Sequence, residues 1–339
     1  MGLDLPDLRR HAGARSGKSD GPGHNDTGPG QGLIEEGEQA RKAVADAQRQ
    51  TTARQSLAKN PNFEQISPEV GRLDEDALRD LLDRDPDQAL TMLAELTGTT
   101  DPVLRSLARQ LAGRIMVDVA RTGRADRGGI GRLRRARAAD GGDLDLDASI
   151  EPLADSRAAG EPPSLDDLWV RKWGRPMTAL CLVVDRSGSM AGQRLATMAV
   201  AAAAVAFRQG DDDYSVISFA RDAVVVKAQG EHRPVERVVD DVLSLRGHGV
   251  TDLALALQAA RRQLERSNAS HKVTIVLSDG RATAGNDPLG QARHLDTVHV
   301  LAPSGDAEEA ILLARAGNGS CVEITVPTDA PAAIAALLA

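Results

Sequence analysis

The sequence predicts an α/β protein whose main domain is a doubly wound, mostly parallel six-stranded sheet with one antiparallel edge strand. From residue 176 onward, short apolar segments of strand length alternate with helical patterns. This alternation is typical of a parallel sheet covered by helices on both faces. Several of the segments are continuous apolar runs, which favours strands buried on both sides. Ahead of this domain the sequence predicts a small α-helical region and a disordered N-terminus.

Residues 1–60 are expected to form a disordered or partly helical segment. Residues 16–32 are rich in Gly, Pro, Ser and Asp and contain almost no large apolar side chain. The rest of the segment has a helix-forming composition but only a thin apolar stripe. Residues 12–19 match a relaxed phosphate-loop pattern, yet no buried strand precedes them and no helix can follow. We therefore interpret this match as accidental and expect no nucleotide binding.

Residues 61–122 are predicted to be a small helical region. Two candidate helices lie at 73–85 and 86–96, and a third follows at 99–122. The third opens with Thr100 or Asp101 as N-cap and with Pro102 at the first helical position. Leu, Ile and Val then recur at spacings of three and four, which indicates an amphipathic helix with one core-facing stripe.

Residues 123–175 are predicted to be a connector that is basic first and acidic later. The stretch 121–137 holds seven arginines and one acid, and residues 143–147 are acidic. The basic strip could bind an anion or a partner. It could equally be a solvated connector whose arginines pair with nearby acids. Nucleic-acid binding is disfavoured by the net charge of -8 and by the scarcity of aromatic side chains.

Residues 176–339 hold the sheet domain. We expect strands at the apolar segments 178–185, 213–219, 223–228, 272–279, 296–302 and 321–326. Because only a few residues join the second and third segments, these two should form a hairpin and supply the antiparallel edge. The helical segment 194–207 is apolar nearly all round and should be deeply buried.

Oxygen-bearing side chains follow the strands at several of their carboxyl ends. Asp185, Ser187 and Ser189 follow the first strand, Thr251 stands just before a helix, and Asp279 follows the fourth strand. In an open α/β sheet, ligands bind at the carboxyl ends of the strands near the point where strand order reverses. Carboxylates and hydroxyls are hard donors that suit Mg²⁺, or Mn²⁺ and Ca²⁺ less selectively. Each motif alone is an ordinary turn or helix cap, but together they favour a metal site.

This pattern resembles the metal-ion-dependent adhesion site of the von Willebrand factor A (VWA) domain. The resemblance covers 176–339, and all five motif positions are filled, by Asp185, Ser187, Ser189, Thr251 and Asp279. It implies a VWA/Rossmann-like fold with strand order 3-2-1-4-5-6. It also implies that the hydroxyls bind the metal directly and that one or both Asp often act through water. An Asp or Glu of a partner protein would then complete the coordination shell.

The resemblance implies an intracellular protein-interaction module, not an enzyme. The chain is similar to bacterial VWA proteins associated with MoxR-type AAA+ ATPases and to the D subunits of metal chelatases, although no AAA+ domain is recognised in it. We therefore expect an adaptor for such an ATPase or for a chelatase-like complex. The alternative is a Mg²⁺-dependent hydrolase, which needs a general base beside the metal. His248 and Asp252 are the candidates, and neither lies in a recognisable catalytic motif.

Neither a membrane anchor nor a secretion signal is apparent in the sequence. The longest apolar stretch, 195–207, is too short and too Ala-rich to cross a bilayer. The N-terminus has no apolar segment after its charges and no myristoylation pattern. Cys181 and Cys321 are expected to be small buried hydrophobes and not a disulfide pair. A cytoplasmic location with no membrane partner follows as the expectation.

Overall fold

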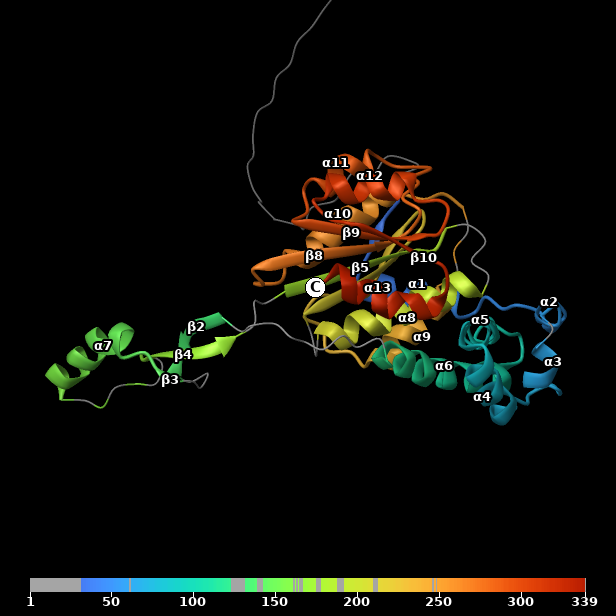
Figure 1. The fold of residues 1–339 in the computed structure, drawn as a ribbon, viewed down its shortest axis with the longest axis horizontal. Coiled ribbons are helices and arrows are strands. Elements are labelled where there is room, and N and C mark those ends of the chain that lie inside the picture. Colours follow the sequence, from blue (N-terminus) through green and yellow to red (C-terminus); the bar gives the residue numbers. More distant parts are fainter. Residues whose placement is uncertain are drawn as a thin grey trace, which may run out of the picture. The chain divides into compact units, whose positions relative to one another are not determined.

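A computed structural model describes residues 32–60, 62–122, 132–138, 143–160, 162, 164, 167–174, 178–187, 192–209, 213–245, 247 and 249–338 (Figure 1). All of them belong to one unit of the chain, Gly32–Ala339. Several features singled out by the sequence lie outside the described residues: Ser189, His248, the phosphate-loop match at 12–19, nearly all of the Gly- and Pro-rich stretch 16–32, and residues 123–131 of the basic strip.

The main sheet confirms the predicted fold class and adds a seventh strand. Its order is β1-β7-β6-β5-β8-β9-β10. The strands are β1 Ile34–Glu35, β5 Thr178–Asp185, β6 Tyr214–Phe219, β7 Ala223–Lys227, β8 His271–Leu277, β9 Thr297–Pro303 and β10 Cys321–Ile324. Without β1, this is the order 3-2-1-4-5-6 that the resemblance implies. The predicted hairpin is the antiparallel pair β6–β7, and the other neighbours in the sheet pair in parallel. Strand β7 is not the edge that the sequence predicted, because β1 pairs with its outer side.

Strand β5 lies at the centre of the sheet, where strand order reverses. It pairs in parallel with β6 on one side and with β8 on the other. Residues 179–184 are all buried, as the continuous apolar run predicts. Leu180, Leu182 and Val184 belong to the core on one face of the sheet, and Ala179, Cys181 and Val183 belong to the core on the other.

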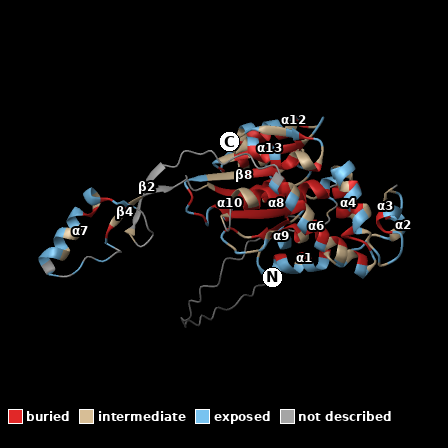
Figure 2. Cartoon of the chain, turned by 60° about the horizontal axis from the view of Figure 1, so that its bottom comes forward, coloured by how far each residue is buried: buried red, intermediate tan, exposed pale blue. Residues whose placement is uncertain are grey.

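Helices cover both faces of the sheet (Figure 1). One face carries α10 Leu253–Leu264, α11 Pro288–Ala292 and α12 Glu308–Ala316. The other face carries α8 Gln193–Gln209, α9 Val235–Ser244 and α13 Ala330–Leu337. A short 3₁₀ turn, η2 Pro327–Asp329, precedes α13. Every residue of α8 from 195 to 206 is buried, which confirms the expected deep burial of this helix. Figure 2 shows buried residues concentrated in the sheet and in α8.

The helices before the sheet domain share its hydrophobic core. They are α1 Glu38–Ala47, α2 Arg54–Leu57, α3 Phe63–Ile66, α4 Glu75–Arg84, α5 Pro86–Leu96 and α6 Pro102–Thr122. Of the two N-cap candidates, Asp101 caps α6: its Oδ1 accepts from the backbone N of Val103 (3.0 Å) and of Leu104 (3.2 Å). Helices α5 and α6 contact α8 on the side that faces away from the sheet, so α8 lies inside one continuous core.

The segment predicted as a connector contains regular structure. Strands β2 Arg132–Arg137, β3 Asp143–Leu144 and β4 Trp169–Gly174 form an antiparallel sheet in the order β2-β4-β3, and helix α7 covers Leu146–Ala159. Asp145 accepts from Ala148 N at the start of α7 (3.3 Å) and pairs with Arg171 of β4 (2.9 Å). The acidic stretch is therefore tied to a basic side chain nearby in the same small sheet.

Two further expectations concern the cysteines and the membrane. Both cysteines are free thiols; Cys181 is buried and Cys321 is half-buried. Burial raises the pKa of Cys181 to about 12. Among the helices that the structure describes, none combines the length and the apolar composition needed to cross a bilayer.

Candidate metal centre

Asp185 ends strand β5 with both carboxylate oxygens already oriented. Its Oδ1 accepts from the backbone N of Ser187 (2.8 Å), and its Oδ2 accepts from the hydroxyl of Ser278 (2.8 Å). Burial raises the pKa of Asp185, hydrogen bonds from Ser187 and Ser278 oppose the rise, and the charge of Asp279 adds to it. The carboxylate is therefore fixed at the edge of the sheet, close enough to Asp279 for the two charges to repel.

Asp279 lies in a tight turn directly after strand β8. Its Oδ1 accepts from the backbone N of Arg281 (2.9 Å). Gly280 has φ +84°, and a Cβ there would lie 2.5 Å from the backbone N of Ala310 in α12, so the turn requires glycine. The guanidinium of Arg281 is held by Asp306 (2.6 Å). These contacts position Asp279 at the same end of the sheet as Asp185.

The loop that carries Thr251 contacts both the loop after β5 and the loop after β8. The backbone N of buried Thr251 donates to Thr283 Oγ1 (2.8 Å), and its carbonyl accepts from Thr283 N (3.0 Å). At the other end of the loop, a Cβ on Gly247 would lie 2.2 Å from the carbonyl oxygen of Arg186. Gly247 therefore lies against the loop after β5, and Thr251 contacts the loop after β8.

Three of the five predicted ligands line one cavity. Asp185, Ser187 and Asp279 border a cavity of about 220 Å³ at the carboxyl ends of β5 and β8. Thr251 is not among the lining residues, although its loop contacts Arg186. The structure therefore brings three predicted ligands together and places the loop of the fourth beside them, while the fifth, Ser189, lies outside the described residues.

The residues present fit a hard divalent cation. The predicted ligands offer only carboxylate and hydroxyl oxygens, which suit Mg²⁺ or Mn²⁺. In the described part of the chain no group of three or more His, Cys, Asp or Glu could hold a metal ion, so a metal here depends on hydroxyl ligands. A cation beside Asp185 would also offset the cost of burying its carboxylate.

Sequence reasoning missed two residues that support the site. Ser278 orients Asp185, and its place directly before Asp279 is the signal that could have pointed to it. The second is Arg186, which lies between Asp185 and Ser187 in the sequence. Its backbone N donates to the carbonyl of Phe219 (2.8 Å), which ties the loop after β5 to the neighbouring strand β6.

Comparison with known proteins identifies the domain. Residues 180–281 match the family model of the von Willebrand factor type A domain. The chain carries a VWA domain. Such domains are typically protein-interaction or adhesion modules. The matched residues contain Asp185, Ser187, Thr251 and Asp279, whereas the cavity is also lined by residues of β9 and β10 that lie beyond the match.

One curated relative and several solved structures are similar to this chain. A stretch of 130 residues is 35% identical to an uncharacterized protein of Mycobacterium tuberculosis, covering 35% of this chain and 20% of that protein. The chain thus spans about a fifth of that relative's length. An aerotolerance-related membrane protein from Bacteroides fragilis is 19% identical over 48% of this chain and 98% of its own (TM-score 0.40). The manganese-loaded TRAP protein of Plasmodium vivax is 13% identical over 47% and 72% (TM-score 0.39).

Proposed function

We propose that this chain is a protein-interaction module whose VWA domain binds Mg²⁺ and recruits a partner protein through an Asp or Glu of that partner. The observation that carries the proposal is the cavity shared by Asp185, Ser187 and Asp279 where strand order reverses. Ligands of α/β sheets bind at this position. The VWA family match supports an interaction role over a catalytic one.

The proposed ligands divide into two chemical kinds. The hydroxyls of Ser187, Ser189 and Thr251 would hold the ion directly, and Asp185 and Asp279 would stabilise it through their charges, directly or through water. A Mg²⁺ held mostly by neutral oxygens keeps enough positive charge to take a further anionic ligand. Mn²⁺ accepts the same oxygen donors and is the more convenient probe.

A hydrolase would need a general base beside the ion. Asp252, one of the two candidates, caps helix α10: its Oδ1 accepts from Leu255 N (2.9 Å). The other candidate, His248, lies outside the described residues. Since Asp252 already has a structural role, we do not propose a second, catalytic function.

The proposed partner is a MoxR-type AAA+ ATPase or a component of a chelatase-like complex, in the cytoplasm of a bacterium. This part of the proposal rests on the resemblance of the site motif. Pull-down from the native cell with and without EDTA, followed by mass spectrometry, tests it. An AAA+ ATPase should be captured only with Mg²⁺ present. Partners that bind equally well in EDTA would contradict recruitment through the metal.

Metal binding itself is tested by calorimetry with Mn²⁺. The double variant Ser187→Ala with Ser189→Ala should lose binding while its circular dichroism stays native. Ser320→Ala, which removes an exposed hydroxyl elsewhere in the domain, serves as the matched control and should bind as the wild type does. Unchanged binding in the double variant would refute the ligand assignment.

A further inference from the structure

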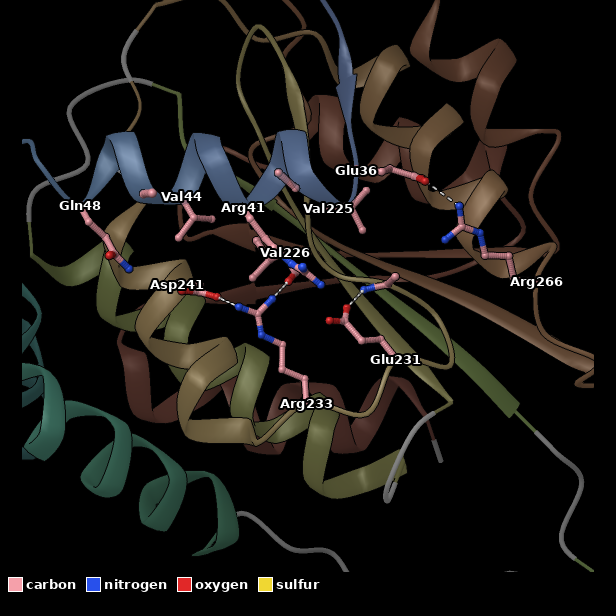
Figure 3. A pocket seen from close by; sticks show the side chains of 14 residues that line it. Glu36, Arg41, Val44, Gln48, Val225, Val226, Glu231, Arg233, Asp241 and Arg266 are labelled. Atoms are coloured by element: carbon pink, nitrogen blue, oxygen red, sulfur yellow. Dashed lines mark hydrogen bonds and ion pairs between the residues drawn. The ribbon is translucent and has the colours of Figure 1, made fainter. Parts of the chain in front are cut away.

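A cavity of about 630 Å³ lies between α1, β7 and α9 (Figure 3). Its volume falls in the range of small-molecule binding sites, about 300–1,000 Å³. None of the described residues that line it also lines the cavity beside Asp185. A ligand bound between α1 and β7 would therefore occupy a second site, separate from the proposed metal centre.

The cavity lies where the strand pairing at the edge of the sheet ends. Strand β1 pairs only with Ala223 and Val224 of β7, and beyond this pair α1 contacts both β7 and α9. The face of α1 that lines the cavity carries Ala40, Val44 and Ala45, which are spaced as residues on one side of a helix. These short side chains do not fill the space between the helix and the sheet edge.

The walls of the cavity are aliphatic on two sides. Val44 lies on the α1 side, and Val225 and Val226 lie on the β7 side, each at most 7% exposed. Exposed residues such as Ala45 and Arg266 belong to the same lining, so a ligand can enter from solvent. Walls of this kind favour a ligand that carries an apolar body.

The carboxylates of the lining are already engaged by the protein. Each accepts a hydrogen bond or forms an ion pair, and Figure 3 shows these contacts around the cavity. The pairs are Asp241 with Arg233, Glu36 with Arg266, and Glu231 with the backbone N of Ala228. The negative groups of the lining therefore do not call for a cationic ligand.

Arg41 differs from the other two arginines of the lining. Figure 3 shows its side chain pointing from α1 into the cavity. Among the described residues, none forms an ion pair or a hydrogen bond with its guanidinium. A guanidinium presents a planar fork of N–H donors that matches the two oxygens of a carboxylate. The unused binding capacity of the cavity is thus that of an anion site.

The charge balance of the lining favours a ligand with one negative charge. Three arginines and three carboxylates line the cavity, so its formal net charge is zero. A phosphate ester would bring up to two negative charges close to Glu231 and Asp241, which would repel it. A carboxylate brings one negative charge, which Arg41 balances.

We propose that this cavity binds a small organic carboxylate with a short aliphatic body. Arg41 holds the carboxylate, and the body lies between Val44 and the two valines of β7. This binding goes beyond the proposed recruitment of a partner through a metal and does not depend on it. Because the ligand contacts both α1 and β7, it ties the N-terminal helix to the sheet domain.

The experiment uses 4-methylpentanoate as the probe and the full chain as the protein. EDTA is present throughout, so that no carboxylate binds through a divalent cation at the proposed metal centre. The Tm should rise with probe concentration, because a ligand that binds the folded state stabilises it, and calorimetric titration should give a saturable affinity. 4-Methylpentanamide, which has the same body without the charge, should bind at least about tenfold more weakly. Acetate should also bind at least about tenfold more weakly, because each buried carbon is worth about fourfold in affinity.

Substitutions at Arg41 test the assigned contact. Arg41→Gln should weaken binding of 4-methylpentanoate by at least about tenfold while the circular dichroism stays native. Arg41→Lys keeps the charge without the planar fork and should recover part of the affinity. Arg49→Gln is the matched control, because it removes the same group from a position just past α1 that is outside the lining and has an 81% exposed side chain. It should bind as the wild type does.

Several results would overturn the inference. They are a wild type without saturable binding of 4-methylpentanoate, equal binding of the amide, wild-type affinity in Arg41→Gln, and an equal loss in Arg49→Gln. Tighter binding of isopentyl phosphate would assign the cavity to phosphate esters instead, and tighter binding of an acetylated peptide that ends in leucine would assign it to a peptide C-terminus. If Arg41→Gln does not fold, the ligand series on the wild type still decides. All of these results leave the proposed metal-binding function standing, because EDTA removes the metal from every measurement.

Discussion

The shared core of the N-terminal helices and the VWA sheet predicts a large effect of Leu93→Ala. Leu93 of α5 is fully buried and belongs to the same hydrophobic core as α8 and β5. Removing three buried carbons at about 0.8 kcal/mol each costs about 2.4 kcal/mol. The cavity left behind brings the expected loss of unfolding free energy to about 3–4 kcal/mol.

Urea denaturation measures this loss, and hydrogen exchange tests its cause. If α5 and the sheet unfold as one unit, Leu93→Ala should increase exchange in peptides of β5 as much as in peptides of α5. Val103→Ala, at a residue of α6 that is 56% exposed, is the control and should change stability by less than about 0.5 kcal/mol. Faster exchange confined to α5, with β5 protected as in the wild type, would refute the single core.

Three further predictions concern separate features of the chain. Gly280→Ala should destabilise the protein by at least about 1 kcal/mol in thermal unfolding, because φ is +84° and the new Cβ would meet Ala310; wild-type stability would contradict the required turn. Burial raises the pKa of Asp241 to about 6 although Arg233 lowers it, so its contribution to stability should decline as pH rises from about 4 to 6. Denaturation across this range should show a smaller decline in Asp241→Asn, and identical profiles would contradict the raised pKa. Neither the wild type nor Lys18→Ala should bind ATP detectably in a nucleotide-binding assay. Micromolar ATP binding by the wild type that is lost in Lys18→Ala would show that the 12–19 match is functional.

Much of the sheet domain could be predicted because its signals are local. The charge-free run of β5 and the apolar surface of α8 reflect burial on all sides, and each can be recognised in one short segment. The β6–β7 hairpin is likewise encoded by two adjacent segments and a short turn. The candidate ligands could be predicted because strand ends converge wherever parallel strands lie side by side.

The features that sequence reasoning missed depend on distant partners. Strand β1 has only two residues, and it exists because β7 offers its edge. Strand β2 is mostly arginine, a composition with no preference for strands. It forms a strand because its backbone pairs with β4. The small sheet therefore could not be predicted from residues 123–175 one segment at a time.

The upstream helices contact the sheet domain a few residues after Ser187, one of the proposed ligands. Gly192, just before α8, has φ +48°, and a Cβ there would lie 2.6 Å from both Thr91 and Glu95 of α5. A side chain at position 192 would therefore meet α5, so the close packing of α5 against the start of α8 requires glycine here. This requirement joins two segments about 100 residues apart, and no pattern within either segment alone could have indicated it.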